Sequence, residues 1–126
     1  MNRVLAWIPV LLWAALIFWF SAQSAPPDFG PNLPKKRKIE HMAGYAVFGC
    51  LILRALRKAH ALPLPKATWL AILLVAAYAA SDEWHQTFVP NRTGQVSDVV
   101  IDTVGGGIAI AGYFGYESCR SSKTNR

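Results

Sequence analysis

Three short polar blocks interrupt an otherwise apolar chain. The first holds Lys38, His41 and Tyr45, whose spacing places them on one stripe of a helix. The second covers residues 81–86 (Ser-Asp-Glu-Trp-His-Gln). The third covers residues 97–102, where two aspartates four positions apart point the same way on a helix. Together the blocks offer cations, a histidine and carboxylates, which are groups that bind anions and transfer protons.

The composition excludes several functional classes. Apolar residues make up 53% of the 126 residues and charged residues 16%, whereas soluble domains carry about 25% charged residues. This balance argues against a soluble enzyme, and the hydrophobicity argues against disorder. The net charge of +6 does not indicate nucleic-acid binding, because the basic residues lie between apolar runs, as in membrane proteins with charged loops.

Four apolar segments predict the fold class. We expect an all-α membrane protein with one domain over residues 1–126, in which four transmembrane helices form an antiparallel bundle with short links. The predicted helices cover residues 4–22, 39–56, 67–88 and 97–116, and a polar tail covers residues 117–126. The first segment also fits a signal peptide, but its uncharged run is longer than the usual apolar core of about 7–15 residues.

An antiparallel bundle brings the three polar blocks to one membrane face. The start of the second helix, the end of the third and the start of the fourth meet there, while the opposite face carries basic residues and Glu117. Eight lysines and arginines lie on the side of the termini and five on the other, which predicts cytoplasmic termini and an extracytoplasmic polar pocket. Ionisable groups at membrane depth each cost roughly a few kcal/mol, so they are usually paired and functional.

Each polar residue also has a simpler interpretation. The basic run at 35–37 fits a solvated or headgroup-binding loop, and His41 alone fits an interfacial residue. Asp98 alone fits a helix N-cap, and Asp82 and His85 could face headgroups. Their joint presence on one face favours a functional pocket.

Two further patterns bear on packing. Gly107, Ala111 and Gly115 form a stripe of small residues, which predicts close helix packing along that stripe. Cys50 lies in an apolar run and Cys119 in the polar tail, so we expect no disulfide between them.

The polar blocks resemble those of the VanZ-like family of small membrane proteins, over roughly residues 3–116. The similar motifs are Lys38-x-x-His41-x-x-x-Tyr45, Glu83-x-x-Gln86-x-Phe88-x-Pro90-x-Arg92 and Asp98-x-x-x-Asp102. Asn91 stands where family members often have glycine, and Asp102 is the acidic variant of a position that is often asparagine.

The resemblance implies a multi-pass protein with four helices in a bacterial-type cell membrane. The family's namesake is linked to low-level resistance to teicoplanin, hence to envelope and antibiotic-resistance chemistry. A remote kinship has been proposed with the Lipocone superfamily of lipid head-group enzymes, such as phosphatidylserine synthases. By that analogy the polar face would act on a phospholipid or polyprenyl-linked headgroup, as a phosphoester hydrolase or transferase.

The hypothesis of a headgroup enzyme assigns a role to each polar residue. Glu83 or His41 would activate an alcohol or water. Arg92 and Lys38 would neutralise the phosphate oxygens, Arg92 with bidentate geometry, and Gln86 would orient the substrate. Asp98 and Asp102 would orient His41 or a divalent cation; with Glu83, they offer oxygen ligands for Mg²⁺ or Ca²⁺, although no metal ligand is assigned. The expected catalytic residues are Glu83, His41 and Asp98, and the expected substrate-binding residues are Lys38, Arg92, Gln86, Asp102 and Tyr45.

Two other hypotheses explain the same face. A non-catalytic module would bind an anionic lipid or glycopeptide there, and a structural network of ion pairs would fix the bundle. An enzyme should lose function in Glu83→Gln while it keeps its fold, whereas a binder should depend mostly on Arg92 and Lys38. A structural network should lose expression when any member is changed. Membrane lipids are the expected partners under the first two hypotheses.

Overall fold

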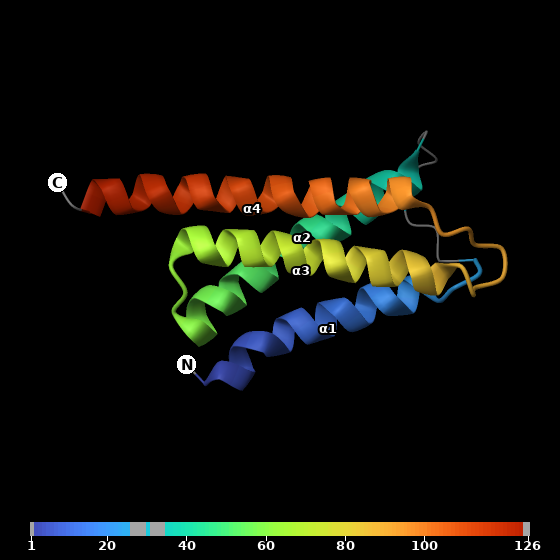
Figure 1. The fold of residues 1–126 in the computed structure, drawn as a ribbon, viewed down its shortest axis with the longest axis horizontal. Helices are drawn as coiled ribbons and strands as arrows, with labels where there is room; N and C mark the ends of the chain where they lie inside the picture. The colour runs from blue at the N-terminus through green and yellow to red at the C-terminus, as the bar shows by residue number, and fades with distance from the viewer. Residues whose placement is uncertain (1, 26–29, 31–34, 125–126) are drawn as a thin grey trace.

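The computed structural model describes residues 2–25, 30 and 35–124, and this part of the chain forms four helices. Each helix is long and apolar enough to cross a membrane, and the four pack together, so the predicted fold class is confirmed (Figure 1). The helices are α1 (Arg3–Ser21), α2 (Lys36–His60), α3 (Leu64–Gln86) and α4 (Val96–Thr124).

Local sequence explains the start of α1 and the turn between α2 and α3. The side chain of Asn2 caps α1 by accepting a hydrogen bond from the Val4 amide at 3.1 Å. Ala61 ends α2 in a left-handed conformation with φ of 50°, and Arg57 Nη1 donates to the Leu62 carbonyl at 2.9 Å across the turn. Pro65 then lies in the first turn of α3, where its missing N–H costs nothing.

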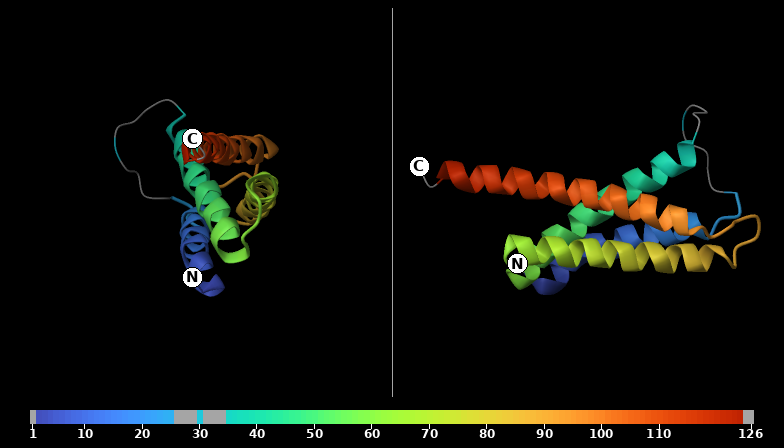
Figure 2. Two further views of the ribbon diagram at one scale, coloured as in Figure 1. Left: turned by 90° about the vertical axis from the view of Figure 1, so that its left-hand side faces the viewer. Right: turned by 45° about the horizontal axis from the view of Figure 1, so that its top comes forward.

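Helix α2 crosses the bundle obliquely and packs on all three other helices, most extensively on α4 (Figure 2). Its buried face contributes large side chains, among them Tyr45 and Ile52. Helix α3 adds to the same core a stripe of mostly small residues at four-residue spacing, all fully buried: Ala67, Ala71, Val75 and Ala79. Small side chains let helix backbones approach closely, which strengthens the van der Waals packing between helices in lipid.

Helix α1 is the most peripheral of the four in its contacts. It packs mainly on α2 and only slightly on α3. Two hydrogen bonds hold its middle turns: Trp13 Nε1 donates to the Gly44 carbonyl of α2 at 2.9 Å, and Tyr78 Oη of α3 donates to the Ala14 carbonyl at 2.6 Å. Both bonds use aromatic polar tips, which need a partner when they lie in an apolar environment.

Helix α4 approaches α2 and α3 closely at two glycines, but not along the stripe predicted from the sequence. A Cβ atom on Gly105 would lie 2.6 Å from the Met42 carbonyl oxygen, and one on Gly106 would lie 2.7 Å from Val75 Cγ1. By contrast, nothing lies within 4 Å of a Cβ atom built on Gly107 or Gly115. The prediction that the 107–111–115 stripe mediates packing is therefore wrong, because that stripe points away from the neighbouring helices.

The helix bounds differ from the predicted ones at the charged ends. The second helix runs over Lys36–His60 rather than 39–56, and the third ends at Gln86 rather than 88. The predicted polar tail is helical through Thr124, while residues 125–126 lie outside the described part of the chain. Between the first two helices, residues 26–29 and 31–34 also lie outside the described part. Both cysteines are free, as expected.

The start of α1 and the end of α4 lie at the same end of the bundle, opposite the polar blocks (Figure 1). We expect this end to face the cytoplasm, because it carries the larger number of lysines and arginines. Reporter fusions after residues 30, 61, 93 and 126 should then report outside, inside, outside and inside. An extracytoplasmic signal from the fusion after residue 126 would reverse the orientation and place the polar end at the cytoplasmic leaflet.

Candidate functional site

The polar end of the bundle, where α2 and α4 begin and α3 ends, buries several polar side chains. Those less than 5% exposed are Ser21, Asp82, Glu83, Gln86 and Asp102. Three of the five are carboxylic acids, whose burial in a membrane protein is costly unless they are paired, protonated or bound to a cation. The site is therefore defined by what these three acids contact.

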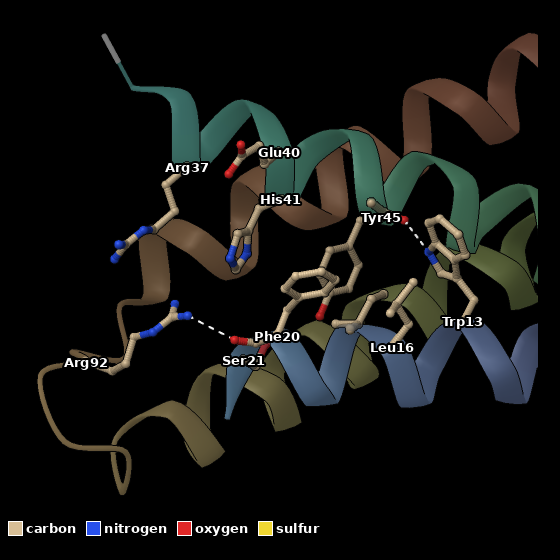
Figure 3. Close-up of a pocket in the computed structure, with 11 residues that line it drawn as sticks. Trp13, Leu16, Phe20, Ser21, Arg37, Glu40, His41, Tyr45 and Arg92 are labelled. Atoms are coloured by element: carbon tan, nitrogen blue, oxygen red, sulfur yellow. Dashed lines mark hydrogen bonds between the residues drawn. The ribbon is translucent and has the colours of Figure 1, made fainter. Parts of the chain in front are cut away.

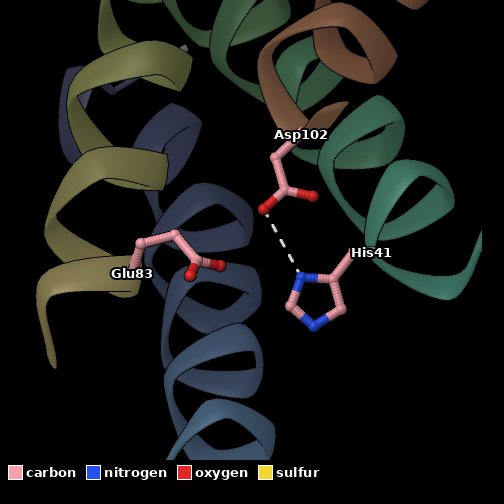
Figure 4. Close-up of side chains that lie close together, drawn as sticks. All are labelled: His41, Glu83 and Asp102. Carbon is pink, nitrogen blue, oxygen red and sulfur yellow. Dashed lines mark hydrogen bonds and ion pairs between the residues drawn. The ribbon is translucent and has the colours of Figure 1, made fainter. Parts of the chain in front are cut away.

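Two of the acids meet a histidine. His41 of α2, Glu83 of α3 and Asp102 of α4 each offer one ligand atom, and these atoms all lie within 4.8 Å of one another (Figure 4). We call these three residues the carboxylate–histidine cluster. His41 Nδ1 lies 3.4 Å from Asp102 Oδ2, and Glu83 Oε2 accepts a hydrogen bond from the Gln95 amide at 3.0 Å. Three separate helices thus converge on one point.

The third buried acid, Asp82, is paired with Tyr45, which lies one turn after His41 on α2. Tyr45 Oη donates to Asp82 Oδ2 at 3.1 Å, and the two residues are 1% and 4% exposed. Asp82 therefore points into the bundle, so the interpretation in which it faces headgroups is wrong. Asp82 directly precedes Glu83 on α3, so a third carboxyl group lies one residue from the cluster.

Arg92, in the loop between α3 and α4, is bonded to the end of α1. Its Nε donates to the Gln23 carbonyl and its Nη2 to the Phe20 carbonyl, each at 3.0 Å. The last carbonyls of a helix have no intrahelical partner and carry partial negative charge, so a guanidinium is a suitable cap. Burial lowers the pKa of Arg92, and the nearby positive charge of Arg37 lowers that pKa further.

Gln86 makes a second connection to α1. Its Nε2 donates to Ser21 Oγ at 3.4 Å, and both side chains are buried. Gln86 and Arg92 are both predicted substrate-binding residues. In the structure, Gln86 connects the end of α3 to α1, and Arg92 connects the following loop to α1. The sequence did not indicate these partners, because backbone carbonyls and a lone serine carry no recognisable signal.

Lys38 and Asp98 form a pair outside the cluster. Lys38 Nζ lies 3.8 Å from Asp98 Oδ1, and their side chains are 48% and 28% exposed. A partly exposed pair at this distance contributes about 0–1 kcal/mol. Asp98 thus engages a lysine instead of joining Glu83 and Asp102, and His41 takes the third place in the cluster.

A first cavity of about 340 Å³ lies between α1 and α2 (Figure 3). Its wall on α1 is apolar and includes Trp13, Leu16, Ile17 and Phe20. At the polar end of the bundle, the lining changes to Ser21, Arg37, Glu40, His41, Tyr45 and Arg92. The cavity is therefore amphipathic along its length, with an apolar section and a cationic section.

A second cavity of about 290 Å³ lies over the start of α4. Arg37, His41 and Arg92 line both cavities, so the two adjoin at these residues. The second cavity is also lined by four further predicted site residues: Lys38, Gln86, Asp98 and Asp102. The sequence did not predict Arg37 as a site residue, because it belongs to a basic run that fits a solvated loop.

These observations define a four-span membrane protein with a buried acidic site beside a basic, amphipathic cavity. The chain belongs to the VanZ/LLP1 family, whose model matches residues 6–117, as its polar motifs predicted. Comparison with curated proteins and with solved structures gave no match. The protein is thus a multi-pass membrane protein of this family.

Proposed function

We propose that the protein binds the phosphorylated headgroup of a membrane lipid in the first cavity and acts on its phosphoester. The lipid would be a phospholipid or a polyprenyl-linked lipid of the cell envelope. The observation that carries this proposal is the amphipathic lining of the first cavity, in which the apolar α1 wall continues into a section with two arginines, a histidine and one glutamate (Figure 3).

The lining matches the two parts of a lipid. Trp13, Leu16 and Ile17 offer an apolar surface for a hydrocarbon chain at the depth of the transmembrane helices. Arg37 and Arg92 offer guanidinium groups at the end where a headgroup would lie, and charge-assisted hydrogen bonds from arginine to phosphate are among the strong ones. Both ends of the ligand would thus have a suitable environment.

The carboxylate–histidine cluster adjoins the cationic section and would activate the nucleophile. His41 lines the first cavity and contacts Asp102, while Glu83 completes the cluster from α3. A water or alcohol oxygen would attack the phosphorus while its proton passes to the cluster, and the bond to the leaving alcohol would break. The same proton would then return to the leaving oxygen. The arginines would neutralise the phosphate oxygens during this step.

The proposal is tested with purified protein in lipid nanodiscs that contain phosphatidylglycerol, phosphatidylethanolamine or a polyprenyl diphosphate. Turnover is followed by ³¹P NMR and mass spectrometry of the lipids. We expect Glu83→Gln and His41→Gln to lower turnover at least about 100-fold while they keep lipid binding, because the change removes proton acceptors but no arginine. Glu117→Gln, the same type of change near the other end of α4, should have no effect.

Two outcomes would count against this enzyme. Undiminished turnover in Glu83→Gln and His41→Gln would exclude the cluster as the reacting centre. Saturable lipid binding by the wild-type protein without turnover of any lipid would favour the alternative, a non-catalytic module for an anionic lipid or glycopeptide. The arginines at the cationic section would support that alternative on their own, because they bind an anion without help from the cluster.

A further inference from the structure

We propose that the carboxylate–histidine cluster is a binding site for a divalent first-row metal ion, such as Mn²⁺ or Zn²⁺. The binding itself is argued from His41, Glu83 and Asp102 alone. Only the role of the ion in turnover rests on the proposed function. In turnover, the ion would lower the pKa of a bound water molecule, and this water would be the nucleophile that the cluster activates.

The positions of the ligand atoms fit such an ion. Imidazole nitrogens and carboxylate oxygens bind these ions at about 2.0–2.2 Å, so two ligands on opposite sides of an ion are at most about 4.4 Å apart. The three ligand atoms of the cluster lie within 4.8 Å of one another, and each side chain comes from a different helix (Figure 4). Small side-chain adjustments would therefore bring all three into the coordination sphere.

The bonding of the two acids leaves atoms available to an ion. Among the described residues, Glu83 Oε1 and Asp102 Oδ1 are buried and have no hydrogen-bond partner. Such buried polar atoms are rare in native proteins and call for an ion, a proton or a water. Glu83 Oε2 is held by the Gln95 amide, an outer contact of the type that orients metal-binding carboxylates.

Lysine and arginine side chains do not neutralise these acids. Within the described part of the chain, no lysine or arginine forms an ion pair with Glu83 or Asp102. Lys38 pairs with Asp98, and Arg92 donates to the carbonyls at the end of α1. A divalent cation would supply the missing positive charge at a place where the cost of burying two carboxylates is high.

The donor set indicates which ions fit. One imidazole with two carboxylates suits first-row transition ions, whereas Mg²⁺ and Ca²⁺ favour oxygen ligands alone. Three protein ligands also leave coordination positions open, as in catalytic sites. Because His41 and Asp102 line the second cavity, an open position there could accept water or a phosphate oxygen.

The competing explanation is a proton shared between His41 and Asp102, which would hold their 3.4 Å contact without any ion. The two explanations differ in what the protein binds, so a direct titration separates them. The full chain is purified in detergent, treated with EDTA, transferred to metal-free buffer and titrated with Mn²⁺, while the EPR signal of free Mn²⁺ is recorded. Zn²⁺ is then added as a competitor, and its binding to metal-free protein is also measured directly by isothermal titration calorimetry.

We expect one Mn²⁺ per chain, displaced by Zn²⁺, and at least tenfold weaker binding in Glu83→Gln and in Asp102→Asn. Glu40→Gln is the matched control, because Glu40 neighbours His41 on α2 but pairs with Lys36 at the surface. Size-exclusion elution and helical circular dichroism establish that each variant is folded.

Absence of saturable Mn²⁺ and Zn²⁺ binding by the wild-type protein would overturn the proposal whatever the variants do. Unchanged Mn²⁺ affinity in both cluster variants would overturn it as well. The result is independent of the proposed function. Metal binding without lipid turnover would contradict only the enzyme, whereas lipid turnover by protein that binds no metal would contradict only the metal site.

Discussion

Replacing Gly105 by alanine should prevent α2 and α4 from packing as they do in the native bundle. A Cβ atom at this position would lie 2.6 Å from both the carbonyl oxygen and Cγ of Met42. The carbonyl belongs to the backbone of α2 and cannot rotate away, so the helices must separate. Overpacking in a tight core costs about 1–3 kcal/mol and sometimes more, and here it affects the most extensive interface of the bundle.

The matched control for this change is Gly107→Ala, two positions further along the same helix. Nothing lies within 4 Å of a Cβ atom at Gly107, so its stability should stay the same or rise slightly through the better helix propensity of alanine. Yield of monodisperse protein in mild detergent and the midpoint of SDS-induced unfolding measure both variants. Equal midpoints for Gly105→Ala and Gly107→Ala would show that the close contact is not needed.

Arg92→Gln should have the second large effect, because Arg92 holds α1 and also lines both cavities. Its two hydrogen bonds to carbonyls at the end of α1 would be lost, and hydrogen bonds from a charged donor contribute about 1.5–3 kcal/mol each. The cationic section of the first cavity would also lose one of its two arginines. We expect a clearly lower unfolding midpoint together with at least about tenfold weaker binding of anionic lipid.

Two further variants separate these roles. Arg92→Lys keeps the charge but lacks the planar guanidinium with its several donors. It should therefore recover part of the lipid binding but little of the pair of hydrogen bonds to α1. Arg120→Gln removes the same charge from an exposed position near the other end of α4 and should change neither property. Wild-type stability and lipid binding in Arg92→Gln would contradict both roles.

The number and type of the helices could be predicted from the sequence because burial in lipid requires long apolar runs. The ends of α2 and α4 could not, since hydropathy falls where lysines and arginines begin but the backbone continues as a helix through Lys36–Lys38 and through Thr124. Long basic side chains extend toward the headgroups, so charge marks the membrane boundary rather than the helix end.

The three consecutive glycines of α4, the last of which begins the predicted stripe of small residues, show a second limit of sequence patterns. Gly105, Gly106 and Gly107 are adjacent, and helical spacing predicts which residues share a face but not which face meets a neighbour. The structure places Gly105 and Gly106 against α2 and α3, and it places Gly107 outside these contacts. The choice depends on the rotation of α4, which is set by the whole interface.

The site was predicted in part. Antiparallel order brought the three polar blocks to one end, and His41, Glu83 and Asp102 do meet there. The sequence could not show that Asp98 would pair with Lys38 instead, because both aspartates share a helix face and differ only by one turn. The catalytic and substrate-binding roles of these residues stay predictions.

The position of the first cavity, between α1 and α2, has a consequence for kinetics. A lipid that fills it would keep its chains in the bilayer and would approach by lateral diffusion in the membrane plane. Its effective concentration is then a mole fraction among the surrounding lipids, rather than a molarity in the buffer. At a fixed amount of substrate, added neutral lipid or detergent should slow the reaction by surface dilution, whereas added buffer should leave the rate per protein unchanged.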